Sequence, residues 1–452
     1  MLNVVRARLE VALAKELAGL GPHKKGAAQS QPRVMPPIER INGCRQTTHL
    51  FSTADGLTLH LIQIAAAAGQ ADAPVMWVSG TGLSWKTWDL NDDASVALKA
   101  AQAGIISYLF STRGVEPNQA ALLTHPATIE TEIKYDLPAA LRFAQAHSKK
   151  PVTLAGYSKG GVVILYFLVY HCFKLQQLLG RDFLLKGKTR KEIGEYIASL
   201  PPNSDLAQAA QRHLEILNSV NGLILLGAPL VFEKGLSDLA SLPAAALLAW
   251  QSLGGENVPV QLAQKLVRLF PFLANAGRLA INPENFADPQ AFLAEFCTKC
   301  LGSVPTIVAR QAFHDVLKGR GTHPIPDYLF DFGSNLDLIP LDIPVFMFCG
   351  RKDLIAPLFN LGLIDPAYAR ESSIELSLLK RFPHKEQVVH SIASEKDVAQ
   401  IRLSSNRSSV TGFAIEGVNH LDLFFGRVGR TAVRPLLYQI IKHLANPSAS
   451  AP

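Results

Sequence analysis

The fold is decided by the stretch Pro151-Val-Thr-Leu-Ala-Gly156-Tyr-Ser158-Lys-Gly160-Gly161. A short apolar segment leads into a Gly-x-Ser-x-Gly sequence, and a long apolar segment follows it. This order predicts a buried strand, a sharp turn at Ser158 and a helix. At such a turn the serine is strained, and glycine is needed beside it because a Cβ would collide with the neighbouring strand and helix. The alternative interpretation is an ordinary strand-to-helix turn.

The sequence on both sides of this turn repeats the alternation of strand and helix. Short apolar segments are typical of buried strands, and segments with helical spacing separate them. The alternation predicts an α/β fold with a mainly parallel sheet that has helices on both faces. The expected strands are 73–78, 105–110, 151–155, 222–226, 344–349 and 412–416, after a hairpin over 49–64, and the expected helices are 94–103, 128–147, 160–175 and 431–444.

The predicted core is split by a long insertion. Residues 46–229, with an excursion at 176–218, form its first part, and residues 341–452 form its second part. The stretch 230–340 between them is too long for one strand-to-helix connection and is rich in Leu, Ala and Phe, so we expect an inserted helical cap. Residues 1–45 are expected to be an N-terminal extension and linker.

Composition and charge exclude several classes of protein. The chain has 452 residues, of which 48% are hydrophobic and 18% charged, so it is neither disordered nor collagen-like. Its net charge of +7 comes from residues 1–40 and 174–195, which lack the context of a nucleic-acid-binding surface. We therefore expect no nucleic-acid partner. The cluster Lys186-Gly-Lys188-Thr-Arg190-Lys191 leaves two interpretations open, a solvated loop or a peripheral contact with anionic lipid.

The cysteines and the apolar segments give expectations about redox chemistry and location. Five scattered cysteines do not form a disulfide framework, and the pair Cys297-Thr-Lys-Cys300 has no second pair or spaced histidine, which favours two helix cysteines over a redox or zinc site. No segment has the roughly 18 uncharged apolar residues of a membrane-spanning helix, and the N-terminus lacks the apolar region of a secretory signal. We expect a cytoplasmic protein. The sequence leaves the oligomeric state open.

A nucleophilic serine needs a histidine base and an acid, which follow it in the order Ser, acid, His at a turn of this type. Asp353 comes after the predicted strand 344–349 and a glycine turn. His420 comes after the strand 412–416 and before the last helix. The other late histidines do not follow a late strand, and we interpret them as surface or structural residues; they are His314, His323, His384 and His390.

Acyl transfer also needs two backbone donors for an oxyanion. The amide of Lys159 is the first candidate, and we expect its side chain to point to solvent. The second candidate is the amide of Thr81, in the glycine-rich loop Ser79-Gly-Thr-Gly82 after the strand 73–78. A phosphate-binding loop is excluded there because no Gly-Lys-Ser/Thr follows. No cofactor or metal is expected.

With these motifs the chain resembles the α/β-hydrolase superfamily. Three segments look like its acid-lipase and polyhydroxyalkanoate-synthase-like branches, namely Tyr135-Asp-Leu-Pro-Ala-Ala140, Gly350-Arg-Lys-Asp353 and Asn419-His-Leu-Asp-Leu-Phe-Phe-Gly426. The resemblance implies an α/β-hydrolase fold and a triad of Ser158, Asp353 and His420. Two positions differ: Ser79-Gly80 replaces a frequent His-Gly, and Ser158 replaces the cysteine of the synthases, which favours hydrolysis over polymerisation.

These motifs together predict a serine hydrolase that cleaves a carboxylic ester. The Leu, Ala and Phe residues of the expected cap fit an apolar acyl or lipid-like substrate, or only the core that a helical cap itself needs. Two alternatives stay open, an acyltransferase with the same triad and a non-catalytic binding protein of the same fold. The sequence does not decide the chain length of the substrate, or between ester and thioester.

Overall fold

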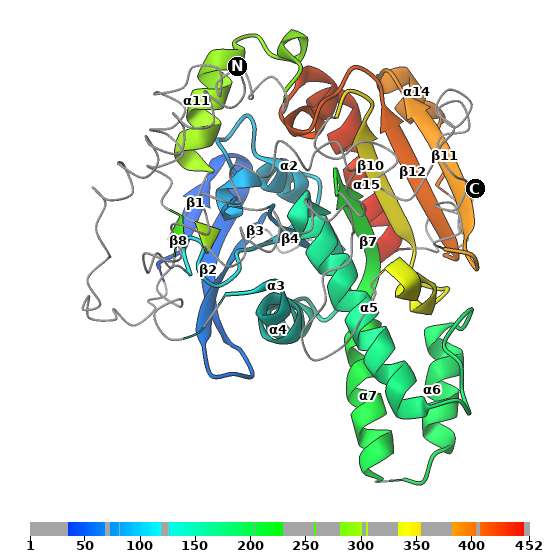
Figure 1. The fold of residues 1–452 in the computed structure, drawn as a ribbon. Helices are drawn as coiled ribbons and strands as arrows, with labels where there is room; N and C mark the ends of the chain where they lie inside the picture. The colour runs from blue at the N-terminus through cyan, green and yellow to red at the C-terminus, as the bar shows by residue number, and fades with distance from the viewer. Residues whose placement is uncertain are drawn as a thin grey trace, which may run out of the picture.

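The structure is a computed structural model that describes residues 35–67, 73–80, 82–118, 125, 127–202, 204–228, 257–258, 281–300, 304–305, 333–353, 382–403 and 407–446. A ten-stranded sheet lies at the centre of this described part (Figure 1). The order of its strands is β1-β2-β3-β5-β4-β6-β7-β10-β12-β11. Their bounds are β1 Ile38–Arg40, β2 Cys44–Ser52, β3 Thr58–Ala66, β4 Ala73–Val78, β5 Ile105–Phe110, β6 Val152–Tyr157, β7 Val220–Leu226, β10 Val345–Gly350, β11 Glu386–Ile392 and β12 Ser409–Ile415.

The sheet is antiparallel at one end and parallel over the rest. Strands β1, β2, β3 and β5 pair antiparallel, whereas every pairing from β5 through β4, β6, β7, β10 and β12 to β11 is parallel. The predicted α/β class is therefore confirmed. Strand β11 was not expected, because its side chains are mostly half-exposed or exposed and its sequence lacks an apolar pattern.

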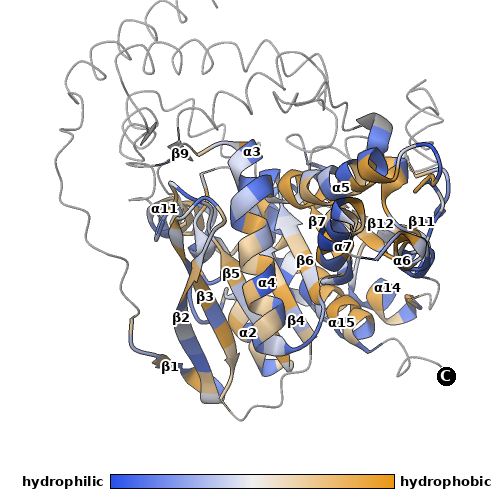
Figure 2. Ribbon diagram, turned by 90° about the horizontal axis from the view of Figure 1, so that it is seen from below, coloured by the Kyte–Doolittle hydropathy of each residue, from blue (hydrophilic) through white to orange (hydrophobic). Residues whose placement is uncertain are grey.

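Helices cover both faces of the sheet (Figure 2). The apolar residues of α4, α5, α6 and α7 form one buried cluster with one face of the strands, and those of α2 and α15 form a second cluster with the other face. Alternation within β4 shows the division, since Met76 and Val78 belong to the first cluster and Val75 and Trp77 to the second. The helices are α2 Val96–Gln102, α3 Ile129–Thr131, α4 Leu137–Ser148, α5 Lys159–Leu179, α6 Arg190–Ser199, α7 Asp205–Asn218, α11 Pro289–Lys299, α14 Glu395–Gln400 and α15 Arg434–Ala445.

Helix α5 is longer than the sequence predicted. By length and composition alone it is apolar enough to cross a membrane, and it is the one such helix in the described part of the chain. Most of this helix is buried inside the protein, where it packs against α7 and strands β6 and β7. This burial is typical of the core helix of a globular protein. The cytoplasmic location stays a prediction.

The excursion after α5 consists of α6 and α7, which form the helical hairpin at the bottom of Figure 1. Each basic residue of its cluster lies within 4 Å of a carboxylate: Lys186 pairs with Asp337 (2.7 Å), Lys188 with Glu192 (3.0 Å), Arg190 with Asp342 (2.7 Å) and Lys191 with Glu195 (3.8 Å). Two of these pairs connect the excursion to residues 337–342, just before β10. Contact with anionic lipid stays a prediction.

Most of the predicted extension and cap lies outside the described residues. Residues 1–34 are not described, and within 230–340 the description covers 257–258, 281–300, 304–305 and 333–340. Of these, 257–258 and 304–305 form the short pair β8 (Asn257–Val258) and β9 (Val304–Pro305). The aromatic side chains of α11 pack against the second cluster of the core.

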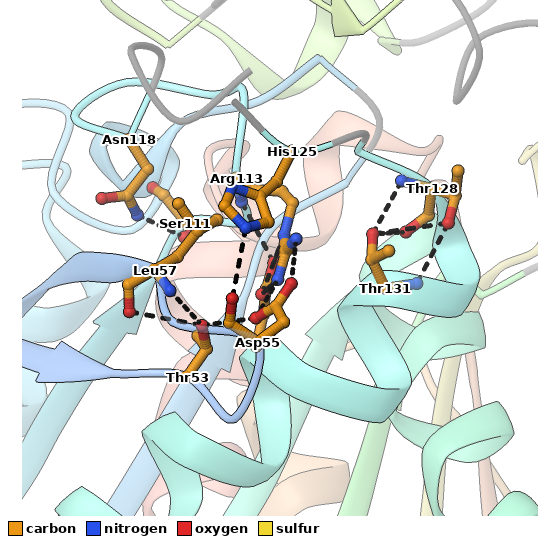
Figure 3. Close-up of polar contacts among 10 residues, drawn as sticks. Thr53, Asp55, Leu57, Ser111, Arg113, Asn118, His125, Thr128 and Thr131 are labelled. Carbon is orange, nitrogen blue, oxygen red and sulfur yellow. Dashed lines mark hydrogen bonds and ion pairs between the residues drawn. The ribbon is translucent and has the colours of Figure 1, made fainter. Parts of the chain in front are cut away.

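A completely buried arginine connects three loops near the hairpin of β2 and β3. Arg113 follows β5 and donates to Asp136 at 3.0 Å and to Asp55 at 2.7 Å. Figure 3 shows Arg113, Asp55 and His125 pointing toward one another, with His125 Nε2 3.2 Å from the carbonyl oxygen of Asp55. Asp136, from the Tyr-Asp-Leu-Pro segment, ends a π-helical turn, Glu132–Asp136, and is also completely buried. Its carboxylate therefore depends on Arg113 for charge balance.

Replacing this buried cation tests that dependence. We expect Arg113→Met to lower the free energy of unfolding by about 3–5 kcal/mol, because it leaves a buried carboxylate without its partner. The matched control is Arg45→Met. Arg45 forms an ion pair with Glu39, and the two side chains are 52% and 63% exposed, so this change should lower the free energy of unfolding by less than about 1 kcal/mol. Urea denaturation measures both. Equal losses for the two variants would contradict the assigned role.

Candidate active site

Ser158 forms the turn between β6 and α5. Its backbone has φ 53° and ψ −125°, a positive-φ conformation that a non-glycine residue rarely adopts. The amide of Ser158 donates to the carbonyl of Leu226, at the end of the neighbouring strand β7 (2.8 Å). The strained serine turn predicted from the sequence is therefore present, and its side chain is half-exposed.

The glycines around Ser158 permit a close approach of helix and strands. A Cβ on Gly156 would lie 2.5 Å from the backbone of Gly160. A Cβ on Gly160 would overlap the carbonyl oxygen of Val78 and lie 2.7 Å from that of Ser79, in β4 and just after it. Real Cβ atoms do not approach backbone this closely, so both positions require glycine.

The predicted acid and base lie together at the same edge of the sheet. Asp353 follows β10 and His420 follows β12, and both are almost completely buried. Nδ1 of His420 is 2.8 Å from Oδ2 of Asp353. Because a carboxylate can only accept, the proton of a neutral imidazole is on Nδ1 and the lone pair is on Nε2.

His420 contacts residues that lie next to Ser158 in the chain or next to its hydrogen-bond partner Leu226. The ring of Tyr157 lies 4.9 Å from the ring of His420, centroid to centroid. A Cβ on Gly227, which follows β7, would be 3.0 Å from Cε1 of His420. Among the described residues none is hydrogen-bonded to Ser158 Oγ. The hydrogen bond between a catalytic serine and its histidine is often long or poorly aligned in the absence of substrate, so its absence here does not exclude the pair.

Of the two expected oxyanion donors, the amides of Lys159 and Thr81, the structure describes only that of Lys159. Lys159 is the first residue of α5, where a backbone amide has no acceptor within its own helix. Thr81 lies outside the described residues. Its neighbour Gly80 is close to the serine, since a Cβ there would lie 3.2 Å from Cβ of Ser158. The loop after β4 therefore passes beside the nucleophile turn.

The side chain of Lys159 does not point to solvent as the sequence suggested. Its ammonium group donates to both carboxylate oxygens of Glu132, at 2.6 and 2.8 Å. The side chains are 12% and 1% exposed, respectively. The expectation was wrong because Glu132 comes from the π-helical turn before α4, which the local sequence around Lys159 does not reveal. Together with Ser79 and Ser111 the pair lines a small cavity of about 10 Å³.

Asp422 is a buried carboxylate that the sequence analysis did not assign. Its Oδ2 accepts from the backbone amides of Asn419 (3.0 Å) and Asn282 (2.8 Å) and from the side chain of Asn285 (2.8 Å). Burial raises the pKa of Asp422, and these donors lower it by less. The Asn-His-Leu-Asp motif contains both Asp422 and Asn419, but Asn282 and Asn285 lie in the stretch expected to form the cap.

The other late histidines and the Cys-x-x-Cys pair complete the residues considered in the sequence. His390 lies on the edge strand β11 and stacks on Phe413, with 5.6 Å between ring centroids. His314 and His323 lie outside the described residues. Cys297 and Cys300 are free thiols at the end of α11, and burial raises the pKa of Cys300 to about 12. Cys297 lies within α11, and Cys300 is the residue that follows its last turn and is completely buried. In the described part of the chain no group of three His, Cys, Asp or Glu side chains could hold a metal ion.

Comparison with known proteins reveals similarity in structure alone. No protein-family model and no curated protein sequence matches the chain. An esterase from Thermogutta terrifontis is 13% identical, with a TM-score of 0.47 over 88% of this chain and 99% of that one. An esterase from Exiguobacterium antarcticum is 12% identical (TM-score 0.47; 87% and 98% covered). An α/β hydrolase from Penicillium sp. sh18 is 14% identical (TM-score 0.45; 89% and 99% covered).

The described part of the chain has an α/β fold with a mainly parallel sheet. The strained serine between β6 and α5 is the turn that the resemblance to α/β hydrolases implied.

The close packing at the serine turn predicts opposite effects for two glycine substitutions. Gly160→Ala should lower the free energy of unfolding by about 1–3 kcal/mol or more, because α5 must move away from β4. Gly194→Ala, inside α6, brings a Cβ to an ordinary 3.4 Å from Leu214 and should raise it by about 0.5–1 kcal/mol. Urea denaturation measures both. A Gly160→Ala protein as stable as the wild type would contradict the packing argument.

Proposed function

Given this fold, we propose that the protein is a serine hydrolase that cleaves a carboxylic ester through an acyl-enzyme. Ser158 is the nucleophile, His420 the general base and Asp353 the residue that orients the imidazole. The observation that carries the proposal is the 2.8 Å contact between Nδ1 of His420 and Asp353, at the same sheet edge as the strained serine. A serine hydroxyl, a base and a buried carboxylate in this order are what acyl transfer to serine requires.

The proton moves along this set of groups in each half of the reaction. Ser158 Oγ attacks the ester carbonyl while Nε2 of His420 takes its proton. The imidazolium then gives that proton to the leaving alcohol, and the acyl group stays on the serine. Water, deprotonated by the same nitrogen, attacks the acyl-enzyme and releases the acid. Asp353 stabilises the charged imidazole in both halves because it holds Nδ1–H throughout.

The oxyanion is stabilised by backbone donors at the start of α5. The amide of Lys159 has no helical partner, and the positive end of the helix dipole lies there. The ammonium group of Lys159 is already neutralised by Glu132, so the amide is the donor for the oxyanion. The second donor comes from the loop after β4, where we assign Thr81.

The substrate we propose carries an apolar acyl or lipid-like group, and the proposed reaction uses no cofactor or metal.

The imidazole of His420 is set among aromatic rings that exclude water from its inner side. Tyr157 packs on His420, Phe424 on Tyr157 and Trp88 on Phe424, with ring centroids 4.9, 4.9 and 5.1 Å apart. A dry surrounding of this kind strengthens the electrostatic contacts of the reaction.

Removal of the nucleophile is the direct activity test. Ser158→Ala should lower kcat for nitrophenyl esters by roughly 10⁶-fold, the loss typical of a missing catalytic serine. Ser199→Ala, an exposed serine at the end of α6, serves as the control and should stay within about twofold of the wild type. Retention of hydrolysis by Ser158→Ala would refute the assignment. Product analysis with added alcohol separates hydrolysis from acyl transfer, since an acyltransferase would form mainly the new ester.

The role of the acid has its own test. Asp353→Asn preserves the shape of the side chain but permits the other imidazole tautomer, so kcat should fall about 10⁴-fold. Asp205→Asn, at an exposed position in α7, is the matched control and should leave kcat unchanged. Thermal unfolding of the two proteins shows that they are folded. An Asp353→Asn enzyme with wild-type kcat would assign the orienting role to another residue.

A further inference from the structure

Residues 281–300, which we call the brace, lie far in sequence from the candidate catalytic residues but contact loops on both sides of them. The brace comprises the turn Pro283–Asn285 and helix α11. Its first residues contact the loop that carries His420, and its last residue contacts the loop after β4. No other described segment between β7 and β10 has hydrogen bonds to both loops.

Two asparagines of the brace bind the loop that carries His420 at two points, Gly417 and Asp422. Asn282 and Asn285 each donate a side-chain hydrogen bond to the carbonyl of Gly417, at 2.7 and 3.0 Å. The side chain of Asn285 and the amide of Asn282 both donate to Asp422, at 2.8 Å. His420 lies between these two points of attachment, so the brace fixes both ends of its loop.

A chain of buried hydrogen bonds then reaches the catalytic histidine itself. Asp422 accepts from the amide of Asn419 (3.0 Å), and Oδ1 of Asn419 accepts from the amide of His420 (2.8 Å). Asp422 is completely buried and Asn285 almost completely. Since buried polar groups leave little room for alternative partners, this chain specifies one backbone position for His420.

The other end of the brace holds the loop that passes beside Ser158. The amide of Ser84 donates to the carbonyl of Cys300 (2.9 Å), and the Cys300 thiol donates to the carbonyl of Lys86 (3.4 Å). Between the two ends, Phe292 and Phe296 pack on Phe425, with ring centroids 5.3 and 5.5 Å apart. The brace is therefore bonded to both sides of the candidate site.

We propose that the brace sets the histidine loop against the loop after β4, and that Asn285 is the positioning residue through which it acts on His420. The inference rests on the proposed function. Asn285 touches no reacting atom; it holds Asp422, which holds the backbone of His420. A displacement of about 1 Å in a catalytic group can cost on the order of 100-fold in rate.

Variants of the Asn285–Asp422 pair test the proposal. Asn285→Ala removes the donor, and Asn285→Asp sets two carboxylates against each other. We expect kcat for the best nitrophenyl ester to fall about 10- to 100-fold in both, with KM within about twofold. The double variant Asn285→Ala with Asp422→Ala should lose less kcat than the product of the losses in the two single variants, because both changes break the same contact. Glu284→Ala, an exposed neighbour, is the control and should match the wild type.

A measurement without turnover completes the test. Hydrogen–deuterium exchange of residues 417–426 should be faster in Asn285→Ala than in the wild type. Unchanged kcat and exchange in Asn285→Ala, a rise in KM alone, or losses of kcat that simply multiply in the double variant would overturn the proposal. Failure of the wild type to show Ser158-dependent hydrolysis would instead overturn the proposed function, and the exchange rates would still decide whether Asn285 holds the loop.

Discussion

The close packing of helix α5 against strands β4 and β6 is the constraint on which the rest of the structure depends. Because Gly160 has no side chain, the first turn of the helix reaches the backbone of Val78 and Ser79. The chain then passes from β6 into α5 through a tight turn, where Ser158 has a strained backbone with positive φ. The same packing places the amide of Lys159, which has no acceptor within its own helix, beside the serine. One steric requirement thus positions both the proposed nucleophile and the proposed oxyanion donor.

The parallel sheet brings the other groups to this point. Strands β6, β7, β10 and β12 are neighbours and run in one direction, so the loops that follow them meet at one edge. Asp353 and His420 therefore contact each other although another strand, β11, separates them in the chain. The loops are then fixed by buried polar groups, Asp422 beside the histidine and Glu132 beside Lys159. Hydrogen bonds hold these two carboxylates in place, whereas the sheet is held by the packing of apolar side chains on both of its faces.

The features that could be predicted from the sequence are those whose residues lie close together in the chain. The strand, glycine and serine of the turn lie within eleven residues, and Asp353 follows its strand directly, so both were found. The pairing of Lys159 with Glu132 and of Asp422 with Asn285 was not, because each joins segments that only the folded chain brings together. Strand β11 was missed for another reason. It is an edge strand whose side chains are largely solvated, so it needs no apolar pattern.

The central claim is that Ser158 is a nucleophile activated by His420 and Asp353. Labelling with a fluorophosphonate, followed by peptide mass spectrometry, tests it most directly, because the reagent bonds only to a serine whose proton a base removes. The account predicts one adduct, on the peptide that contains Ser158, and its loss in a His420→Ala protein that remains folded. A folded wild-type protein without label, or with label on a different serine, would contradict the account.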